Sequence, residues 1–464
     1  LARRLAKCHQ GPIISTPNPK LSLDPSNRIK ADNFPPAVYN IYKKPLLLHQ
    51  GHMQWLYDHE GRKFLDLFGG IVTVSVGHCH PKVVSAMTEQ LKNIWHTTTI
   101  YRNPRTYEYV EKLASKFPGD LKVVYLLNSG TEANDLAVLL SRMYTGNHDV
   151  LSFQSSYHGY SSGLMGLTAT QMYRLPTPVP TGFQHVMLPD PLRGIWGGCR
   201  DSLSQVPGSC CCPGECASTD KYIHQLNEVK ISIPKRKVAA FFAESIQGVN
   251  GTVQYPKGYL KKAKELIKQN GGLYIADEVQ TGFGRTGDHF WGFQGHDVIP
   301  DIVTMAKGIG NGFPLAAVVT TKEIAQAHTN ATYFNTFGGN PLAATVGRAV
   351  LEVIEEEKLQ ENCKDLGKYF IKQLMDLQAQ HKIIGDVRGK GLMLGLELVV
   401  PGTKDPMDAV KVSDINEAIK DLGILIGRGG RWNNVLRIKP PMCIDKKDVD
   451  YTISVLDEVF KRFK

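Results

Sequence analysis

Two short apolar runs of this 464-residue chain end in side chains that could do chemistry. Residues 272–276 lead into Asp277, and residues 301–306 lead into Lys307. A lysine and an aspartate at the ends of two buried strands are the pair that a pyridoxal phosphate (PLP) enzyme uses. The lysine amine condenses with the cofactor aldehyde, and the aspartate keeps the pyridine nitrogen protonated. The pair therefore predicts PLP chemistry, with Lys307 and Asp277 as the catalytic residues.

A third segment is suited to a phosphate. Residues 123–127 form an apolar run, after which Ser129, Gly130 and Thr131 open a helical pattern. The first N–H groups of a helix, its dipole and nearby hydroxyls together favour a phosphate. The same residues could serve only as a helix cap. Because a lysine and an aspartate follow on later strands, we expect a phosphate-binding turn here.

Three further side chains follow strand-like runs. Tyr157 can stack on a flat ring, although such a tyrosine is more often part of a core or its rim. His158, next to it, contacts the cofactor or serves as a structural hydrogen-bond partner, and we assign it no proton transfer. Glu244 ends an apolar run, where an ionised carboxylate needs a partner or a polar cleft. We expect Glu244 at the same rim as Asp277.

The elements that position these residues are predicted to form an α/β fold with a mostly parallel central sheet. Continuous apolar strands, rather than alternating ones, indicate a sheet buried on both faces, and active groups then collect at the carboxyl ends of the strands. We expect strands at residues 123–127, 150–153, 238–243, 272–276 and 301–306, helices at 134–144 and 260–268, and a hairpin formed by 55–58 and 63–68.

The periodicity changes after residue 341, where long helical patterns at 346–356 and 364–378 precede short strands and a helix near 410–421. We therefore expect a smaller α+β C-terminal domain. The predicted division is an N-terminal arm at 1–36, a segment at 37–90 that joins the small domain, a large PLP-binding domain at 91–345, and the small domain at 346–464.

Composition narrows the class of protein. Hydrophobic residues make up 42% of the chain and charged residues 21%, as in an ordinary globular protein, and no apolar stretch is long enough to span a bilayer. The net charge is +10, but the basic residues are spread along the chain and no nucleic-acid motif accompanies them. We expect neither nucleic acid nor membrane as a partner.

The N-terminus is biased in composition. Residues 1–23 contain four basic residues, several hydroxylated ones and no acid, and the first acidic residue is Asp24. This bias resembles the end of a mitochondrial transit peptide and predicts a location in the mitochondrial matrix. The alternative is a proline-containing arm without a targeting role.

Five of the nine cysteines lie in residues 199–216. The odd total and the size of the chain argue against a secreted disulfide framework. A zinc site needs four ligands, and the three adjacent cysteines at 210–212 cannot easily all turn inward. We expect a surface insertion that holds no metal.

Four motifs, in this order, resemble those of class III, fold-type I, PLP-dependent aminotransferases: GHCHP (77–81), LYIADEVQTGFGRT (273–286), AKGIGNGFPLAAV (306–318) and NTFGGNP (335–341). The resemblance runs from about residue 36 to the C-terminus, and within the family it favours the mitochondrial alanine–glyoxylate branch. It implies that Lys307 carries PLP covalently and that Asp277 pairs with the ring nitrogen. It also implies contacts to the cofactor from Ser129, Gly130, Thr131, Tyr157, Val279 and Gln280.

The resemblance also implies an assembly and a substrate class. Thr336 would reach the cofactor phosphate of a neighbouring subunit, so we expect a homodimer or homotetramer with shared active sites. Arg437 would bind the substrate carboxylate. Relatives that use ornithine or GABA carry a glutamate that can neutralise this arginine, and Val249 stands at that position here.

We therefore expect a ping-pong transaminase that takes L-alanine, and β-amino acids such as 3-aminoisobutyrate, as donors and glyoxylate or pyruvate as acceptor. The alternatives are an ornithine- or GABA-type ω-aminotransferase that uses 2-oxoglutarate, and a PLP lyase or aminomutase of the same family.

Overall fold

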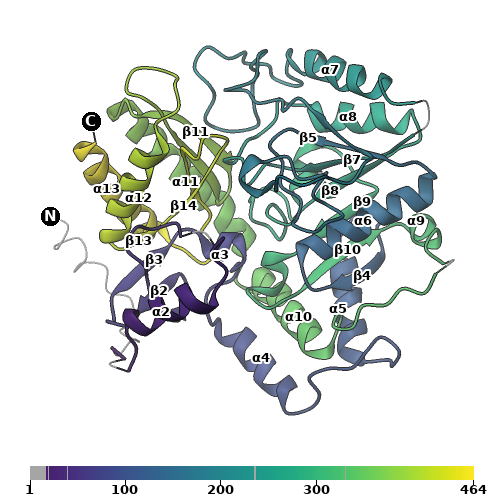
Figure 1. Cartoon of the computed structure of the whole chain (residues 1–464), viewed down its shortest axis with the longest axis horizontal. Coiled ribbons are helices and arrows are strands. Elements are labelled where there is room, and N and C mark those ends of the chain that lie inside the picture. The colour runs from purple at the N-terminus through teal and green to yellow at the C-terminus, as the bar shows by residue number, and fades with distance from the viewer. Residues whose placement is uncertain (1–16, 19, 39, 235–236, 330, 464) are drawn as a thin grey trace.

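The computed structural model describes residues 17–18, 20–38, 40–234, 237–329 and 331–463. Figure 1 shows a larger lobe built on one broad sheet and a smaller lobe that combines the two ends of the chain. Most of the segment with transit-peptide bias, residues 1–16, lies outside the described residues. In the part of the chain that is described, no helix combines the length and apolarity needed to cross a membrane.

The sheet of the larger lobe has seven strands in the order β4-β10-β9-β8-β7-β5-β6. The pairs β5·β6, β5·β7, β7·β8 and β8·β9 are parallel, whereas β10 is antiparallel to both of its neighbours. The predicted mostly parallel sheet is therefore confirmed. The strands are β4 (Val123–Leu127), β5 (Asp149–Phe153), β6 (Phe183–Val186), β7 (Val238–Glu244), β8 (Leu273–Asp277), β9 (Ile302–Met305) and β10 (Ala316–Thr320).

Helices bury this sheet, as its continuous apolar strands require. On α8 (Tyr259–Lys268) the side chains of Tyr259, Leu260, Ala263 and Ile267 are buried, which is the spacing of one helix face. The other helices of this lobe and of the segment leading into it are α3 (Gly69–Val72), α4 (Pro81–Leu91), α5 (Pro104–Ala114), α6 (Gly130–Thr145), α7 (Thr219–Ile231), α9 (Lys322–Gln326) and α10 (Pro341–Glu356).

The smaller lobe contains the sheet β11-β12-β15-β14. Three long helices belong to it, and the predicted helices of this region are confirmed. Its elements are α11 (Leu359–Gln380), β11 (Ile384–Lys390), β12 (Met393–Leu398), α12 (Ala409–Asp421), β14 (Gly427–Gly429), β15 (Val435–Ile438) and α13 (Lys446–Arg462).

A third sheet joins the two ends of the chain. The predicted hairpin is present as β2 (Trp55–Asp58) and β3 (Lys63–Asp66), flanked by β1 (Leu48–His52). Strand β13 (Ile424–Leu425) pairs with β3 in parallel, so the N-terminal segment and the C-terminal part share one sheet. In the described part of the predicted arm, residues 23–33 form α2 (Leu23–Asn33), none of whose residues is buried.

Candidate active site

Three neighbouring strands of the large sheet deliver acidic and basic side chains to one rim. Glu244 ends β7 and Asp277 ends β8, and the two residues are direct partners in the ladder. Asp277 also pairs with Thr304 of β9, and Lys307 follows that strand after one more residue, Ala306. The parallel arrangement therefore brings Glu244, Asp277 and Lys307 together, because parallel strands present their carboxyl ends at one edge.

A cavity of about 170 Å³ lies at this rim. Ser129, Thr336 and Arg437 are not part of its lining, while Asn134, Gly159 and Ala306, which the sequence did not single out, are. The predicted site residues that line it are Gly130, Thr131, Tyr157, His158, Glu244, Asp277, Val279, Gln280 and Lys307.

The Asp277 carboxylate is held by three hydrogen bonds. His158 Nδ1 lies 2.8 Å from Oδ2, Asn134 Nδ2 donates to the same oxygen at 3.1 Å, and the Val279 backbone N–H donates to Oδ1 at 3.0 Å. Asn134 also donates to the His158 carbonyl oxygen at 2.7 Å. It lies one turn into α6, and its polar side chain among the mostly apolar buried residues of this helix was the only signal in the sequence.

The same carboxylate fits the ring nitrogen of PLP. Asp277 is buried, and within the described ranges no lysine or arginine lies in ion-pair distance of it, so His158 is its only potentially cationic partner. His158 Nε2 and Asn134 Oδ1 are buried without a hydrogen-bond partner. A buried carboxylate needs a positive partner. The protonated nitrogen of a pyridine ring in the cavity would supply one.

The N-terminus of α6 forms the second end of the cavity. Ser129 caps the helix: its Oγ accepts from the Glu132 N–H at 3.2 Å and donates to Glu132 Oε2 at 3.1 Å. Burial alone would raise the pKa of Glu132, but hydrogen bonds from Asn128, Asn335 and Ser129 outweigh it and lower this pKa. Ser129 thus acts as a cap, and the next N–H groups of the first turn, which have no intrahelical acceptor, remain for a phosphate.

Glycines keep this end open. A Cβ atom added to Gly130 would lie 3.4 Å from Val279 Cγ2 and 3.5 Å from Ala306 Cβ, in the space between the helix and the cavity wall. Gly159 has a φ of 131°, and a Cβ there would come within 2.8 Å of Leu164 Cδ1 and 3.0 Å of Thr131 Oγ1. Only glycine lets this backbone approach the helix N-terminus so closely.

Lys307 stands on a strained backbone. Its φ is 53°, in the left-handed region that a residue with a side chain rarely adopts. Ser75 Oγ donates to the Gly308 carbonyl oxygen at 2.7 Å, and Asn311 accepts from the Val76 N–H at 3.0 Å, so the N-terminal segment clasps this turn. Burial lowers the pKa of the Lys307 amine, with Arg437 acting in the same direction and Asp277 and Glu244 opposing.

A buried lysine also adjoins the cavity. Lys439 is fully buried, and its Nζ donates to Gln280 Oε1 at 3.1 Å and to the Gly248 carbonyl oxygen at 3.2 Å. Burial lowers the pKa of Lys439 well below its usual value, and the neighbouring Arg437 lowers it further. Because Gln280 receives a hydrogen bond on its oxygen, its amide nitrogen is left for a ligand in the cavity. No motif in the sequence pointed to Lys439.

Glu244 is the second buried carboxylate of the site. The Gly248 N–H donates to its Oε2 at 2.8 Å. Burial, and then the charge of Asp277, raise the pKa of Glu244 to about 7.

Arg437 lies on β15, and its Nη1 donates to the Gly248 carbonyl oxygen at 3.4 Å, the oxygen that also accepts from Lys439. Its Nε donates to the Arg428 carbonyl oxygen at 2.9 Å, and its guanidinium lies 5.1 Å from the centre of the Phe68 ring. It is 6% exposed, yet no carboxylate of the described residues is within ion-pair distance of it. Burial lowers the pKa of Arg437 to about 10. A buried arginine without an acid is suited to a carboxylate ligand.

Val249 adjoins this arginine through Gly429. A Cβ added to Gly429 would lie 2.6 Å from the Val249 carbonyl oxygen and 2.8 Å from Arg437 Nε. Thr336, in contrast, is exposed in the loop before α10 and is away from the cavity of its own chain.

Comparisons with known proteins agree with this geometry. The family model "Aminotransferase class-III" matches residues 38–460. The chain is 52% identical to human "Alanine--glyoxylate aminotransferase 2, mitochondrial" over 92% of its own length and 84% of the relative's. It is 46% identical to "Alanine--glyoxylate aminotransferase 2 homolog 2, mitochondrial" of Arabidopsis thaliana, over 91% and 84%.

Solved structures share the fold. A phospholyase from Arthrobacter in complex with phosphoethanolamine superposes with a TM-score of 0.84 at 32% identity, over 94% of this chain and 99% of that one. An amine transaminase from an uncultivated Pseudomonas species in its PLP-bound form has a TM-score of 0.82 at 29% identity, over 90% and 95%.

Proposed function

The chain belongs to the class III aminotransferase family, whose cofactor is PLP, and we propose that it moves the amino group of L-alanine to glyoxylate or pyruvate. Further donors would be β-amino acids such as 3-aminoisobutyrate. The names of the human and Arabidopsis relatives support this choice of substrates. The observation that carries it is Arg437, a buried guanidinium that no described carboxylate neutralises.

Each residue of the site has a task in this reaction. PLP, when bound, supplies an electron sink for the carbon from which the donor loses its proton. Asp277 would hold the positively charged ring nitrogen, the first turn of α6 the phosphate, and Val279 and Tyr157 the two faces of the ring. Lys307 would carry the cofactor and, once displaced by the donor, move the proton, because a lowered pKa keeps more of its amine unprotonated and able to act as a base.

Arg437 would select the substrate. A guanidinium binds a carboxylate through two parallel hydrogen bonds, and it does so most strongly where water is excluded. The small carboxylates of alanine, pyruvate and glyoxylate need no second charged group. With Val249 instead of an acid near Arg437, the arginine stays available throughout, which disfavours alternation between a 2-oxo diacid and a cationic ω-amine.

A coupled assay tests this proposal. The PLP-loaded protein is supplied with L-alanine and glyoxylate, and pyruvate is followed with lactate dehydrogenase and NADH. Steady NADH oxidation that needs both substrates is the expected result. No pyruvate at saturating cofactor would refute the proposal, and ornithine-dependent turnover with 2-oxoglutarate would favour the ω-aminotransferase alternative.

We also infer that two subunits share each pair of active sites, in a homodimer or a homotetramer of dimers. An exposed apolar patch supports this, because patches of this kind mark interfaces. Its side chains come from the segment 94–101 and from the residues beside Thr336 in the sequence, and they are Ile94, Trp95, Ile100, Tyr101, Phe334 and Phe337. His96 and Phe337 lie in ring contact at 5.6 Å, so the two segments of the patch adjoin. Sedimentation velocity on the protein and on a Trp95→Glu variant tests this; a wild-type monomer would refute it.

We infer the mitochondrial matrix as the site of action, since both relatives are named mitochondrial. The division into an arm (1–36), a joining segment (37–90), a PLP-binding domain (91–345) and a small domain (346–464) is likewise our proposal, and helix α10, which packs on α4 and α5, spans its last boundary. The parallel pairing of β13 with β3 supports the role of the joining segment.

A further inference from the structure

Four cysteines of the segment 199–216 meet at one point. Their Sγ atoms all lie within 4.8 Å of one another, and the four residues are Cys199, Cys210, Cys212 and Cys216. Cys199 and Cys216 are buried, while Cys210 and Cys212 are partly buried. The middle residue of the adjacent three, Cys211, is exposed and points elsewhere.

The sequence argued against a zinc site because the three adjacent cysteines at 210–212 cannot easily all turn inward, but the structure needs only two of them. Two cysteines that are separated by one residue can both turn inward. Cys210 and Cys212 do so, and the fold of the loop places Cys199 and Cys216 next to them. Four thiolates around one Zn²⁺, with Zn–S bonds of about 2.3 Å, lie roughly 3.8 Å apart. The cluster needs only small adjustments to reach that geometry, since Cys210 Sγ and Cys216 Sγ are already 3.3 Å apart.

We propose that Cys199, Cys210, Cys212 and Cys216 form a structural Zn²⁺ site that closes this loop, apart from the PLP site and without a part in its chemistry. Zinc prefers tetrahedral coordination, and a closed set of four cysteines leaves no open position for a catalytic water. On binding, the metal displaces the thiol protons into solvent.

Polar groups also surround the sulfur of Cys216. The Cys199 N–H lies 3.1 Å from Cys216 Sγ, and Ser218 Oγ lies 3.2 Å from the same sulfur. Partners that hold and orient the ligand in this way are typical of metal sites.

Gly198 shows how tightly the loop is closed. Its φ is 141°, and a Cβ atom there would come within 3.2 Å of Cys216 Sγ and 2.5 Å of Ser218 Oγ. The backbone therefore approaches the sulfur as only glycine allows.

The closed loop connects the two lobes. Cys199 O accepts from the Lys257 N–H at 3.1 Å, and the Cys216 N–H donates to Lys257 O at 3.0 Å, so both ends of the loop grip one segment of the larger lobe. The next residue, Arg200, makes two hydrogen bonds to Asp386 of β11 at 2.8 and 2.9 Å. A metal that fixes the loop would thus stabilise the contact between the lobes.

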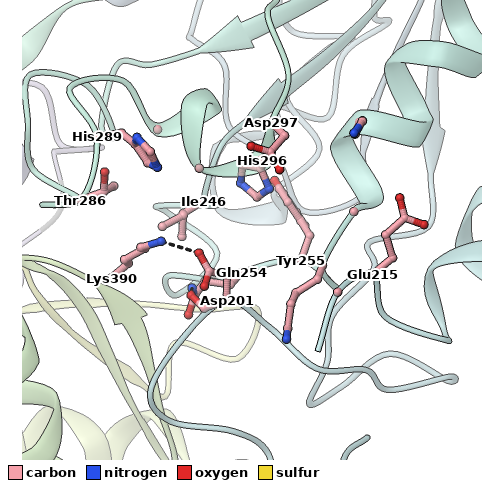
Figure 2. A pocket seen from close by; sticks show the side chains of 16 residues that line it. Asp201, Glu215, Ile246, Gln254, Tyr255, Thr286, His289, His296, Asp297 and Lys390 are labelled. Atoms are coloured by element: carbon pink, nitrogen blue, oxygen red, sulfur yellow. Dashed lines mark hydrogen bonds and ion pairs between the residues drawn. The ribbon is translucent and has the colours of Figure 1, made fainter. Parts of the chain in front are cut away.

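The loop also forms part of the wall of a second cavity, of about 280 Å³ (Figure 2). Glu215 reaches this wall from the loop, and the ion pair between Asp201 and Lys390 lies across from it. Loss of the metal would therefore loosen this wall.

Metal analysis of variants tests the proposal. Protein produced with zinc in the medium and purified in reducing buffer without chelator is analysed by inductively coupled plasma mass spectrometry. We expect about one zinc per chain. Cys210→Ser and Cys212→Ser should reduce it to background, while the matched control Cys211→Ser, which alters the exposed neighbour, should retain it. Retained PLP absorbance in the Ser variants shows that they have folded.

A second readout is the spectrum of the Co²⁺-substituted protein, in which four thiolates give the absorption bands of tetrahedral cobalt, again in Cys211→Ser but not in Cys212→Ser. Removal of zinc should lower the melting temperature by several degrees. The proposal is overturned if no zinc binds even after reconstitution under reducing conditions, if iron takes its place, or if Cys211→Ser loses zinc as fully as Cys212→Ser. A disulfide among the four in rapidly alkylated protein would overturn it as well.

Discussion

His158 Nδ1 and Asp277 Oδ2 are 2.8 Å apart, and both side chains are buried. This contact joins the loop after β5 to the end of β8 and fixes the direction in which the carboxylate faces the cavity. Asn134 donates to the same oxygen from α6. Asp277 is thus held from two sides, and we expect His158 to act on the reaction through Asp277 and not as an acid or base of its own.

Removing this support should weaken catalysis without abolishing it. A hydrogen bond to a charged group contributes about 1.5–3 kcal/mol, so we expect His158→Gln to lower kcat/KM for alanine about 10- to 100-fold. Asn134→Ala should have a similar effect. Because both donors serve one oxygen, the double variant should fall short of the product of the two single effects. Fully multiplicative losses would contradict this coupling.

Lys307 should be indispensable and Lys439 should not. Lys307→Ala removes the proposed base, whose contribution we expect to be about 100- to 10,000-fold in kcat, and it should also remove the visible absorption that depends on the covalent link to PLP. Lys439→Met, a change of similar volume at a buried amine, should keep that absorption and lose less activity. Equal losses in both variants would argue against a unique role for Lys307.

Glu244 gives a prediction for the dependence of stability on pH. Its pKa in the folded protein is raised to about 7, above the value near 4.3 of an unfolded glutamate, so the folded state binds more protons than the unfolded state between these values. Stability from this group is fully present below pH 4.3 and is lost as the pH rises through about 7.

Glu244→Gln removes this titration. In protein stripped of cofactor, the variant should therefore gain stability relative to wild type as the pH rises from about 4.5 to about 7, with a constant difference above that. Urea unfolding at a series of pH values measures it. Glu265→Gln, on the exposed side of α8, is the control, and its difference from wild type should not follow this curve. If the stability of Glu244→Gln relative to wild type falls as the pH rises through this range, the raised pKa of Glu244 is wrong.

Val249 tests the argument on substrate choice. Val249→Glu places an acid near Arg437, where it competes with the substrate carboxylate, and we expect kcat/KM for alanine to fall about 10-fold or more, mainly through KM. Val249→Gln matches the size without the charge and should lose less. If both variants fall equally, the loss is steric, and the absence of an acid does not explain the specificity.

Much of this architecture could be predicted from sequence because its signals are local. Apolar runs mark the strands, and residues that follow parallel strands meet at one edge, which brings Glu244, Asp277 and Lys307 together. Strand β10 was not predicted. Its residues, Ala316–Thr320, are as apolar as those of the parallel strands, and amino-acid composition does not reveal the direction in which a strand runs.

Supporting residues were harder to find. Asn134, Lys439 and Ser75 come from elements far apart in the chain, and each acts through a partner that only the fold identifies. The left-handed backbone of Lys307 also has no sequence signal, since it is imposed by the turns packed around it. The cysteines, in contrast, were conspicuous in the sequence. Their grouping could not be predicted, because it depends on which of the three adjacent cysteines at 210–212 turns outward.

The most direct test of the central claim follows the visible absorption band of the PLP-loaded protein through two separate half-reactions. L-Alanine alone should abolish the band, and glyoxylate added after removal of alanine should restore it, with one pyruvate released for each active site converted. If alanine leaves the band unchanged while ornithine or GABA abolishes it, the proposed specificity is wrong. Ammonia release from a phosphorylated amine without an oxo-acid acceptor would identify a lyase instead.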